Sequence, residues 1–298
     1  MNNFCFIINP ISGIKRKQSI VATIDSVLGE RGISYSLWFT TPKERGEALC
    51  KKAIEEGFSC VIAVGGDGTV HEIGKSLINT NVPLGIIPVG SGNGLARNLG
   101  IPLSLKKAVM NLINGSIAII DTIKVNDEKY LGVAGVGFDA FVAKEFAKET
   151  TRGIKTYSKI VMREFKSFEP SHYEIRLNGE IINTSAFLIT IANSAQYGNN
   201  AHIAPHAKMN DGLFDICIME DFPTLQAPGL IARLFLRNID ESKYYRTVSS
   251  SQCIIKQNQS YVQLDGDVYN LGSELEFNIN PKSLRVITPK KFLTTSSN

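Results

Sequence analysis

The first 122 residues alternate between short β-branched runs and longer segments of helical character, and this alternation constrains the fold more than any other feature. Apolar runs occupy 3–9, 34–40, 60–64 and 83–89. Helix-like segments follow them at 17–30, 43–56, 69–79, and 94–99 with 104–114. Such alternation is typical of βαβ units around a parallel sheet. The sequence therefore predicts an α/β domain over residues 1–122.

The pattern changes to antiparallel β after residue 122. Turn residues at Asn126-Asp127 and at Asn178-Gly179 predict two hairpins. Further strand-like runs lie at 186–193, 213–219, 252–258, 261–267, 274–279 and 284–289. Two helical stretches, at about 139–168 and about 224–238, interrupt them. We expect a β-rich sandwich domain over 123–288, whose last strand is a candidate to return to the first domain, and a flexible tail over 289–298.

Composition restricts the class of protein. A chain of 298 residues with 43% hydrophobic and 20% charged residues can bury two cores. A net charge of +4 is far from that of a strongly basic nucleic-acid binder. Five scattered cysteines without a C-x-x-C pair indicate a reduced chain. With neither a signal-like N-terminus nor an apolar span of about 18 residues, we expect a cytoplasmic protein.

Three glycine-containing loops follow strand ends of the expected parallel sheet. They are residues 9–13, 65–69 and 90–94. Glycines allow positive φ and close backbone approach, so that successive N–H groups can bind phosphate oxygens, and Ser12, Thr69 and Ser91 add hydroxyl donors. None matches a P-loop or a dinucleotide fingerprint. One such loop alone is more often a tight strand-to-helix turn, whereas three at corresponding positions predict a phosphate site.

Six motifs in order make the chain resemble the diacylglycerol/sphingosine-type lipid kinase family, which includes bacterial lipid kinases. They are "NPISG" (9–13), "GGDGTVHE" (65–72), "IPVGSGNGLARNLGIP" (87–102), "GVGFDA" (135–140), "PHAKMNDGLFD" (205–215) and "LDGD" (264–267). The resemblance covers nearly the whole chain, although GGDGT alone also occurs in NAD kinases and phosphofructokinases. It implies an NAD kinase/diacylglycerol kinase-like nucleotide domain, with ATP and Mg²⁺ as cofactors.

The resemblance also implies the residues that bind ATP. These are Asn9, Pro10, Ile11, Ser12, Gly13, Thr41 or its neighbour Thr40, Gly65, Gly66, Asp67, Gly68, Thr69, Val70, His71 and Ser91. Asp67 is a carboxylate inside a phosphate loop, where an unpaired charge would repel phosphate unless Mg²⁺ lay between them, so we assign it a metal-linked role. Gly94 stands where many bacterial relatives carry Asp.

A structural Mg²⁺ site is implied around "MNDGLFD". By similarity, the Asp211 side chain binds the ion, and Lys208 and Leu213 occupy the other two ligand positions. Asp121 aligns with an aspartate linked to Mg²⁺ through water. The alternative for Asp211 is an Asp-Gly turn before a strand. The alternative for Asp121 is a turn residue at a strand start.

Asp265 and Asp267 are the candidate catalytic residues. Two residues apart, they point the same way if the strand continues, and phosphoryl transfer to an alcohol needs a carboxylate that accepts the hydroxyl proton. The family usually shows Glu at the position of Asp267, and the alternative is a hairpin turn. Asp139, in "GVGFDA", resembles a residue that hydrogen-bonds the lipid head in sphingosine kinases; its alternative is a helix N-cap.

Residues 152–168 predict a basic amphipathic helix. Lys155, Lys159, Arg163 and Lys166 fall on one stripe, which favours contact with an anionic membrane or, alternatively, a solvated face over a core. The apolar stretch 227–236 is a second candidate membrane or lid element.

We therefore expect an ATP-dependent lipid kinase that acts on a diacylglycerol or sphingoid hydroxyl, peripherally at the inner membrane face. No nucleic-acid partner is expected, and the sequence leaves a homodimer open. An NAD kinase-like enzyme and a non-catalytic lipid- or nucleotide-binding regulator are the alternatives; Gly94 and Asp267 motivate the second.

Overall fold

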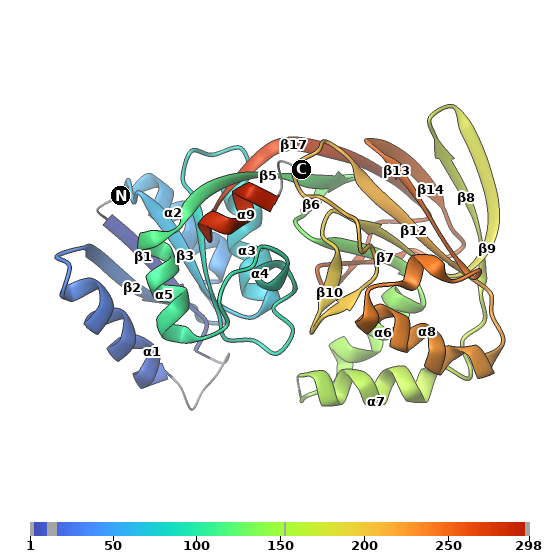
Figure 1. Ribbon diagram of the computed structural model, residues 1–298, viewed down its shortest axis with the longest axis horizontal. Coiled ribbons are helices and arrows are strands. Elements are labelled where there is room, and N and C mark those ends of the chain that lie inside the picture. Colours follow the sequence, from blue (N-terminus) through green and yellow to red (C-terminus); the bar gives the residue numbers. More distant parts are fainter. Residues whose placement is uncertain (1–2, 11–16, 152, 296–298) are drawn as a thin grey trace. The chain divides into compact units, whose positions relative to one another are not determined.

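The computed structural model describes residues 3–10, 17–151 and 153–295, which form two compact units (Figure 1). One unit comprises Met1–Ile120 with Lys282–Asn298, and the other comprises Asp121–Pro281. The chain returns to the first unit in the second half of its longest strand, β17 (Glu274–Thr288).

The first unit is a parallel sheet with helices on both faces. Its strand order is β2, β1, β3, β4 and the end of β17, and all four pairings are parallel. This confirms the α/β prediction. The elements are β1 (Asn3–Ile8), α1 (Lys17–Ile24) continued by a π-helical turn (Asp25–Gly29), β2 (Ser34–Phe39), α2 (Gly46–Glu55), β3 (Cys60–Gly65), α3 (Asp67–Leu77), β4 (Leu84–Pro88), α4 (Gly94–Asn98), α5 (Leu105–Asn114) and α9 (Lys290–Thr295).

Burial on both faces explains why β1, β3 and β4 read as nearly unbroken apolar runs. Phe4, Phe6 and Ile8 of β1 pack with residues of α1 and α5 in one cluster. The intervening Cys5 is also buried, on the side of α2, and burial raises the pKa of its thiol to about 12. All five cysteines are free and buried, so their thiols are shielded from solvent.

The second unit is mainly antiparallel β, as predicted. One path runs β16, β15, β7, β9, β8, β14 and the first part of β17, and β12 joins β9 to β13. The elements are β5 (Ser116–Val125), which begins in the first unit, β6 (Glu128–Tyr130), β7 (Val133–Gly137), α6 (Phe138–Lys148), α7 (Ile154–Glu164), β8 (Ser171–Leu177), β9 (Glu180–Ala192), β10 (Gln196–Gly198), β11 (Ala201–His202), β12 (Phe214–Glu220), a 3-10 turn (Thr224–Gln226), α8 (Ala227–Leu236), β13 (Tyr245–Ser250), β14 (Gln252–Lys256), β15 (Tyr261–Leu264) and β16 (Asp267–Asn270).

Both predicted hairpins form, and each has left-handed backbone at its turn, a conformation that tight hairpins favour. Asn178 and Gly179 have φ of 52° and 81° and connect β8 to β9. Asn126 has φ of 49° and, with Asp127, connects β5 to β6.

Three local predictions are corrected by the structure. The stretch 139–168 is two helices, α6 and α7, separated around Gly153, whose φ of 113° is incompatible with a continuous helix. The strand through "LDGD" does not continue: Asp265 and Gly266, with φ of 49° and 95°, form a tight turn, and Leu264 pairs with Asp267 across it. The C-terminal segment, expected as a flexible tail, contains helix α9.

Within the described ranges, none of the helices is both long and apolar enough to cross a bilayer.

Candidate active site

Two glycine loops follow β3 and β4 and pack backbone against backbone. A Cβ atom added to Gly90 would lie 2.5 Å from Gly66 Cα, and one added to Gly65 would lie 2.3 Å from Thr69 Oγ1. Gly66 has φ of −92° and ψ of −168°, an extended conformation open to any residue. None of the glycines in these two described loops has positive φ. The sequence interpretation was therefore half correct: these loops need glycine for close approach, not for left-handed backbone.

Asp67 joins the two loops through its carboxylate. Its Oδ2 accepts a hydrogen bond from Asn93 N at 2.8 Å, and its Oδ1 accepts one from Gly94 N at 2.7 Å. Gly92 leaves room for this contact, since a Cβ there would lie 2.7 Å from Asp67 Oδ2. The charge of Asp67 is thus already met by backbone donors. Asp67 therefore does not need a cation to balance an unpaired charge, and its metal-linked role stays a prediction.

Asn93 is a site residue that the sequence interpretation missed. Its φ is 52°, and its side-chain amide accepts from Gly90 N at 3.1 Å and donates to Gly90 O at 2.8 Å. Arg97 Nε donates to the Gly92 carbonyl at 2.9 Å. An Asn between two glycines is a recognisable signal, because Asn tolerates left-handed backbone and its short amide bonds locally.

The loop after β1 is connected to the loop after β3 by Asn9, whose Nδ2 donates to Thr69 Oγ1 at 3.2 Å. The structure thereby brings together Asn9, Thr69, Asp67 and the 90–94 loop in one unit. Pro10 follows Asn9, whereas Ile11, Ser12 and Gly13 lie outside the described residues.

The other predicted ATP contacts differ in exposure. Gly68 and Ser91 are exposed, whereas Val70 and His71 are buried in the first unit. Thr41 Oγ1 accepts from Glu44 N at 3.0 Å within its own loop, and Thr40 N donates to the Ile8 carbonyl at 3.0 Å. Accessible donors therefore lie on the loops that follow β3 and β4 and at the exposed Thr41.

Asp139 forms the centre of a buried polar cluster in the second unit. Its Oδ2 accepts from Gln263 Nε2 at 2.9 Å, and its carboxyl also accepts from the Tyr197 hydroxyl. This geometry explains why "GVGFDA" has glycine at positions 135 and 137. A Cβ at Gly135 would lie 1.9 Å from Asp139 Oδ2, and Gly137 has φ of 76°. Gly137, not Asp139, is the N-cap of α6, and no side chain caps it, so the N-cap alternative is excluded.

Burial controls the ionisation of this cluster. It raises the pKa of Asp139 to about 6, although the hydrogen bonds from Gln263 and Tyr197 favour the ionised form. Burial and the charge of Asp139 also raise the pKa of Tyr197 well above its ordinary value. A carboxylate that titrates close to neutral pH is a feature of functional sites as well as of structural networks.

This pKa predicts a pH dependence of stability. Because the folded-state pKa of Asp139 is raised from 3.8 to about 6, its contribution is fully present below about pH 3.8 and is lost as pH rises through about 6. We expect the melting temperature of Asp139→Asn to lack the decrease with rising pH that Asp139 causes in the wild type. Thermal melts of both proteins between about pH 4 and 7 measure it, and identical pH profiles would contradict it.

Gln263 connects Asp139 to the hairpin that carries the candidate catalytic residues. It is buried, and its Oε1 accepts from Gly266 N at 2.8 Å while its Nε2 donates to Asp139. Since Oε1 is engaged by a backbone N–H, the amide group presents a donor to Asp139. A continuous chain of hydrogen bonds therefore links Asp139 to the turn before Asp267.

Asp265 and Asp267 have different environments. The Asp265 carboxylate accepts from the backbone N–H groups of Leu131, Gly132 and Val133 at 2.8, 2.8 and 3.0 Å. It thus anchors the β6–β7 connection. Asp267 is exposed at the first position of β16. The turn between them separates the two carboxylates, so the expected shared face does not exist.

The predicted magnesium residues lie around Gly212. Asp121 is fully buried in the middle of β5, not at a strand start, and its Oδ2 accepts from Gly212 N at 2.8 Å. Asp211 is exposed, and its Oδ1 accepts from Leu213 N at 3.1 Å. Burial raises the pKa of the nearby Asp215, and the charge of Asp211 raises it further. A cation at this turn would relieve that repulsion.

The donors at this turn fit a hard cation only in part. Lys208 and Leu213 are exposed and would have to contribute backbone oxygens. In the part of the chain that the structure describes, no group of three His, Cys, Asp or Glu side chains is arranged to hold a metal. Magnesium at Asp211 therefore stays a prediction.

Comparisons with known proteins show which families the two parts of the chain match. Residues 3–125 match the family model "Diacylglycerol kinase catalytic domain", and residues 132–288 match "YegS C-terminal NAD kinase beta sandwich-like domain". The diacylglycerol kinase of Bacillus subtilis is 32% identical over 221 residues, which is 72% of each chain. The probable lipid kinase YegS of Shigella boydii is 29% identical over 270 residues, 88% of this chain and 89% of the relative.

Another relative is longer than this chain. A protein of Synechocystis sp. is 30% identical over 242 residues, and the match spans only 56% of its length. A crystal structure of a diacylglycerol kinase from Bacillus anthracis has a TM-score of 0.75 at 19% identity, covers 98% of both chains and supports the fold alone. By its two matched domains and its Bacillus subtilis relative, the chain belongs to the diacylglycerol kinase family of lipid kinases, in the form that carries a YegS-type C-terminal domain.

Proposed function

We propose that this protein transfers the γ-phosphate of ATP to a hydroxyl group of a membrane lipid of the diacylglycerol or sphingoid type. The observation that carries the proposal is the hydrogen-bonded chain from Asp139 through Gln263 to Gly266, which holds a buried carboxylate beside the hairpin of Asp267. A hydroxyl acceptor needs both features: a group that receives its hydrogen bond and a base that receives its proton.

The phosphate donor would bind at the glycine loops of the first unit. Gly68 and Ser91 are exposed there, and the loops are held rigid by the contacts of Asp67 and Asn93. Preorganised backbone donors of this kind stabilise phosphate charge without reorganising during reaction. Kinases of this family use ATP, and Mg²⁺, when bound, would neutralise phosphate charge. Asp211, with Lys208 and Leu213, is the proposed structural Mg²⁺ site.

Asp267 is the proposed base. As the lipid oxygen forms its bond to the γ-phosphorus and the bond to ADP breaks, the exposed carboxylate of Asp267 takes the hydroxyl proton and later releases it to solvent. Asp139, ionised above about pH 6, would accept a hydrogen bond from the polar head of the lipid. Gln263 is a positioning residue between them.

A direct experiment tests this proposal. The purified chain is incubated with ATP radiolabelled on its γ-phosphate and with total lipid extract, and in parallel with NAD. We expect label in a lipid with a free hydroxyl, and none in NADP. Labelled NADP without labelled lipid would identify an NAD kinase-like enzyme. ATP binding by calorimetry without any labelled product would favour a non-catalytic regulator.

A further inference from the structure

Helix α8 has an exposed apolar face. Ile231, Phe235 and Leu236 are 47%, 53% and 71% exposed, and Leu225 in the preceding turn is 91% exposed. These are four of the nine large hydrophobic side chains that are exposed in the described residues, yet they lie within twelve residues of sequence. An apolar patch of this concentration is typical of an interaction site.

The opposite side of α8 packs into the interior of the second unit. Ala227 and Leu230 are buried, and Leu230 belongs to the cluster that also contains Ile160 of α7. The one charged residue within α8, Arg233, is paired with Glu241 at 3.1 Å. The helix is therefore apolar on both its buried and its exposed side. A helix face that only met water would carry polar residues.

Helix α7 and the turn after it supply positive charge. Lys155 and Lys159 of α7 and Lys166 of that turn are exposed with i, i+4, i+11 spacing, and Met162, 76% exposed, falls on the same stripe. Arg163 does not belong to this cationic stripe, because its guanidinium lies 2.5 Å from Glu164 and within 4 Å of Glu145 and Glu149. This corrects the four-residue stripe expected from the sequence.

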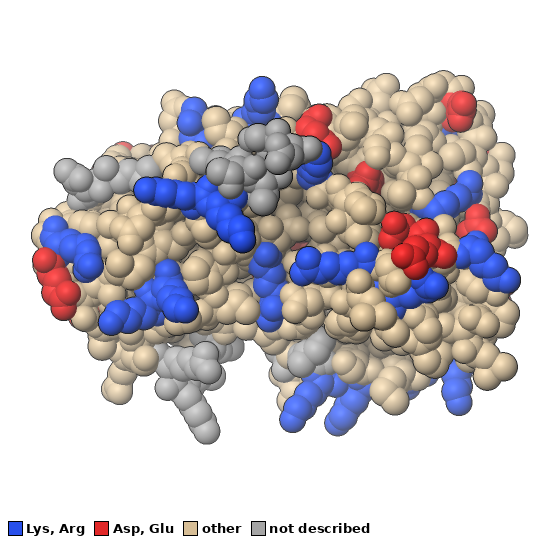
Figure 2. All heavy atoms as spheres, viewed as in Figure 1, with Lys and Arg blue, Asp and Glu red and all other residues tan. Residues whose placement is uncertain are grey.

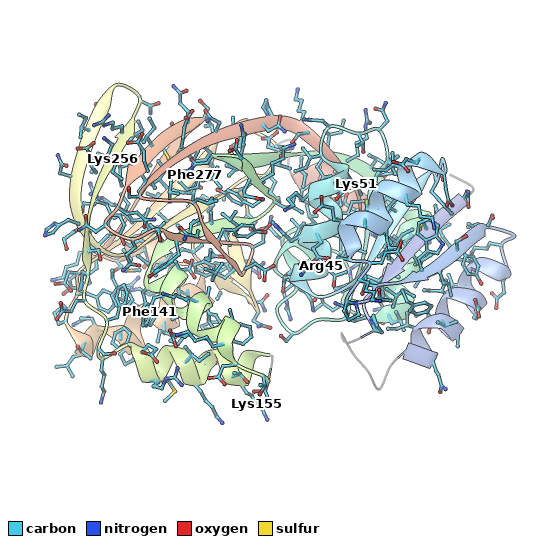
Figure 3. The ribbon with its side chains drawn as sticks, turned by 180° about the vertical axis from the view of Figure 1, so that it is seen from behind. Arg45, Lys51, Phe141, Lys155, Lys256 and Phe277 are labelled. Carbon is cyan, nitrogen blue, oxygen red and sulfur yellow. The ribbon has the colours of Figure 1, made fainter. Side chains whose placement is uncertain are left out.

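The two helices belong to one surface of the second unit. Besides sharing a buried cluster, they are joined where Phe165, at the end of α7, packs on Phe222, just before the 3-10 turn that leads into α8, with ring centroids 6.0 Å apart. Figure 1 shows α7 and α8 at the same edge of this unit, and Figure 3 labels Lys155 near one end of α7. In the view of Figure 2, basic side chains project from that edge, and no acidic side chain is visible beside them on this face.

We propose that this surface docks on an anionic lipid bilayer, with the exposed face of α8 and Leu225 in the interfacial layer and the α7 lysines against lipid headgroups. Adjacent apolar and cationic side chains match the two layers of such a membrane surface. A second copy docked by two-fold symmetry would instead set the lysines of both copies close together. The surface extends the proposed function by naming where the protein meets its lipid phase.

Vesicle binding of the full chain tests this inference without ATP or turnover. Vesicles of phosphatidylcholine and phosphatidylglycerol in equal parts are sedimented with wild type, with the double variant Phe235→Ser, Leu236→Ser, and with Lys155→Glu, Lys159→Glu. We expect each variant to lose at least tenfold in affinity. The charge variant should also lose most of the salt dependence, whereas the apolar variant should keep it.

Matched controls exclude general effects of charge and polarity. Lys106→Glu, Lys107→Glu changes net charge equally on exposed α5 residues, and Ile181→Ser removes an apolar side chain, 58% exposed, beside the β8–β9 turn. Both controls should bind vesicles like wild type. Phe235→Trp should show blue-shifted emission on binding, as its ring leaves water.

Two outcomes would overturn the inference. One is unchanged vesicle binding by the α8 variant. The other is a wild-type dimer in solution that the α8 variant dissociates, since the face would then be a contact between copies. Because the assay uses no nucleotide, loss of this inference is distinguishable from loss of the proposed kinase function, which detergent-dispersed substrate reports separately.

Discussion

Asp267→Asn is expected to lower lipid phosphorylation by roughly 10²- to 10⁴-fold, because the amide keeps the shape of the carboxylate but cannot accept a proton. The side chain is exposed at the start of β16. ATP affinity and melting temperature should therefore change little. Initial rates at saturating ATP, together with calorimetry and thermal melts, measure the three effects.

Asp265→Asn is the matched control for this prediction. Its carboxylate accepts three backbone hydrogen bonds, so an amide there would set an N–H donor against a backbone donor. A cost of about 1–3 kcal/mol is expected, which lowers the melting temperature by several degrees. If Asp267→Asn retains wild-type turnover, the hairpin has no part in proton transfer, and the proton passes to Asp67, Asp139 or water.

Gly90→Ala is expected to weaken ATP binding by more than tenfold. The added Cβ would lie 2.5 Å from Gly66 Cα, a contact between two backbones that no side-chain rotation can relieve. The loops after β3 and β4 would have to separate, which would also strain the bonds from Asn93 to Gly90. Isothermal calorimetry with ATP measures the loss.

Gly66→Ala provides the graded comparison. Its Cβ would lie 3.3 Å from Gly90 Cα, and its backbone conformation suits alanine, so a shift of a few tenths of an ångström suffices. Gly29→Ala has open space around it and controls for the substitution itself. We expect the loss of ATP affinity to rank Gly90→Ala above Gly66→Ala above Gly29→Ala. Equal affinity for all three folded variants would refute a phosphate site at these loops.

The sequence by itself determined the parallel α/β unit, the antiparallel unit after it and the hairpins at Asn126 and Asn178. Hydrophobic periodicity and turn chemistry act over a few residues, so they can be recognised without knowing what packs where. The same local signals failed at "LDGD": continuing strand and tight turn were both compatible with it, and the left-handed backbone of Asp265 and Gly266 selects the turn.

Only the tertiary structure decided what the candidate site residues do. Asp265 accepts hydrogen bonds from residues more than 130 positions away in the sequence, and Asp67 accepts them from residues 26 and 27 positions ahead. Asp139 accepts one from Gln263, 124 positions away. Pairings of this range depend on strand register and on which groups burial removes from water. Burial likewise sets the pKa of Asp139, and the packing of α6 against α7 withdraws Arg163 from the lysine stripe. The physical reason is that charge, hydrogen bonding and desolvation are properties of neighbours in space, which local sequence does not specify.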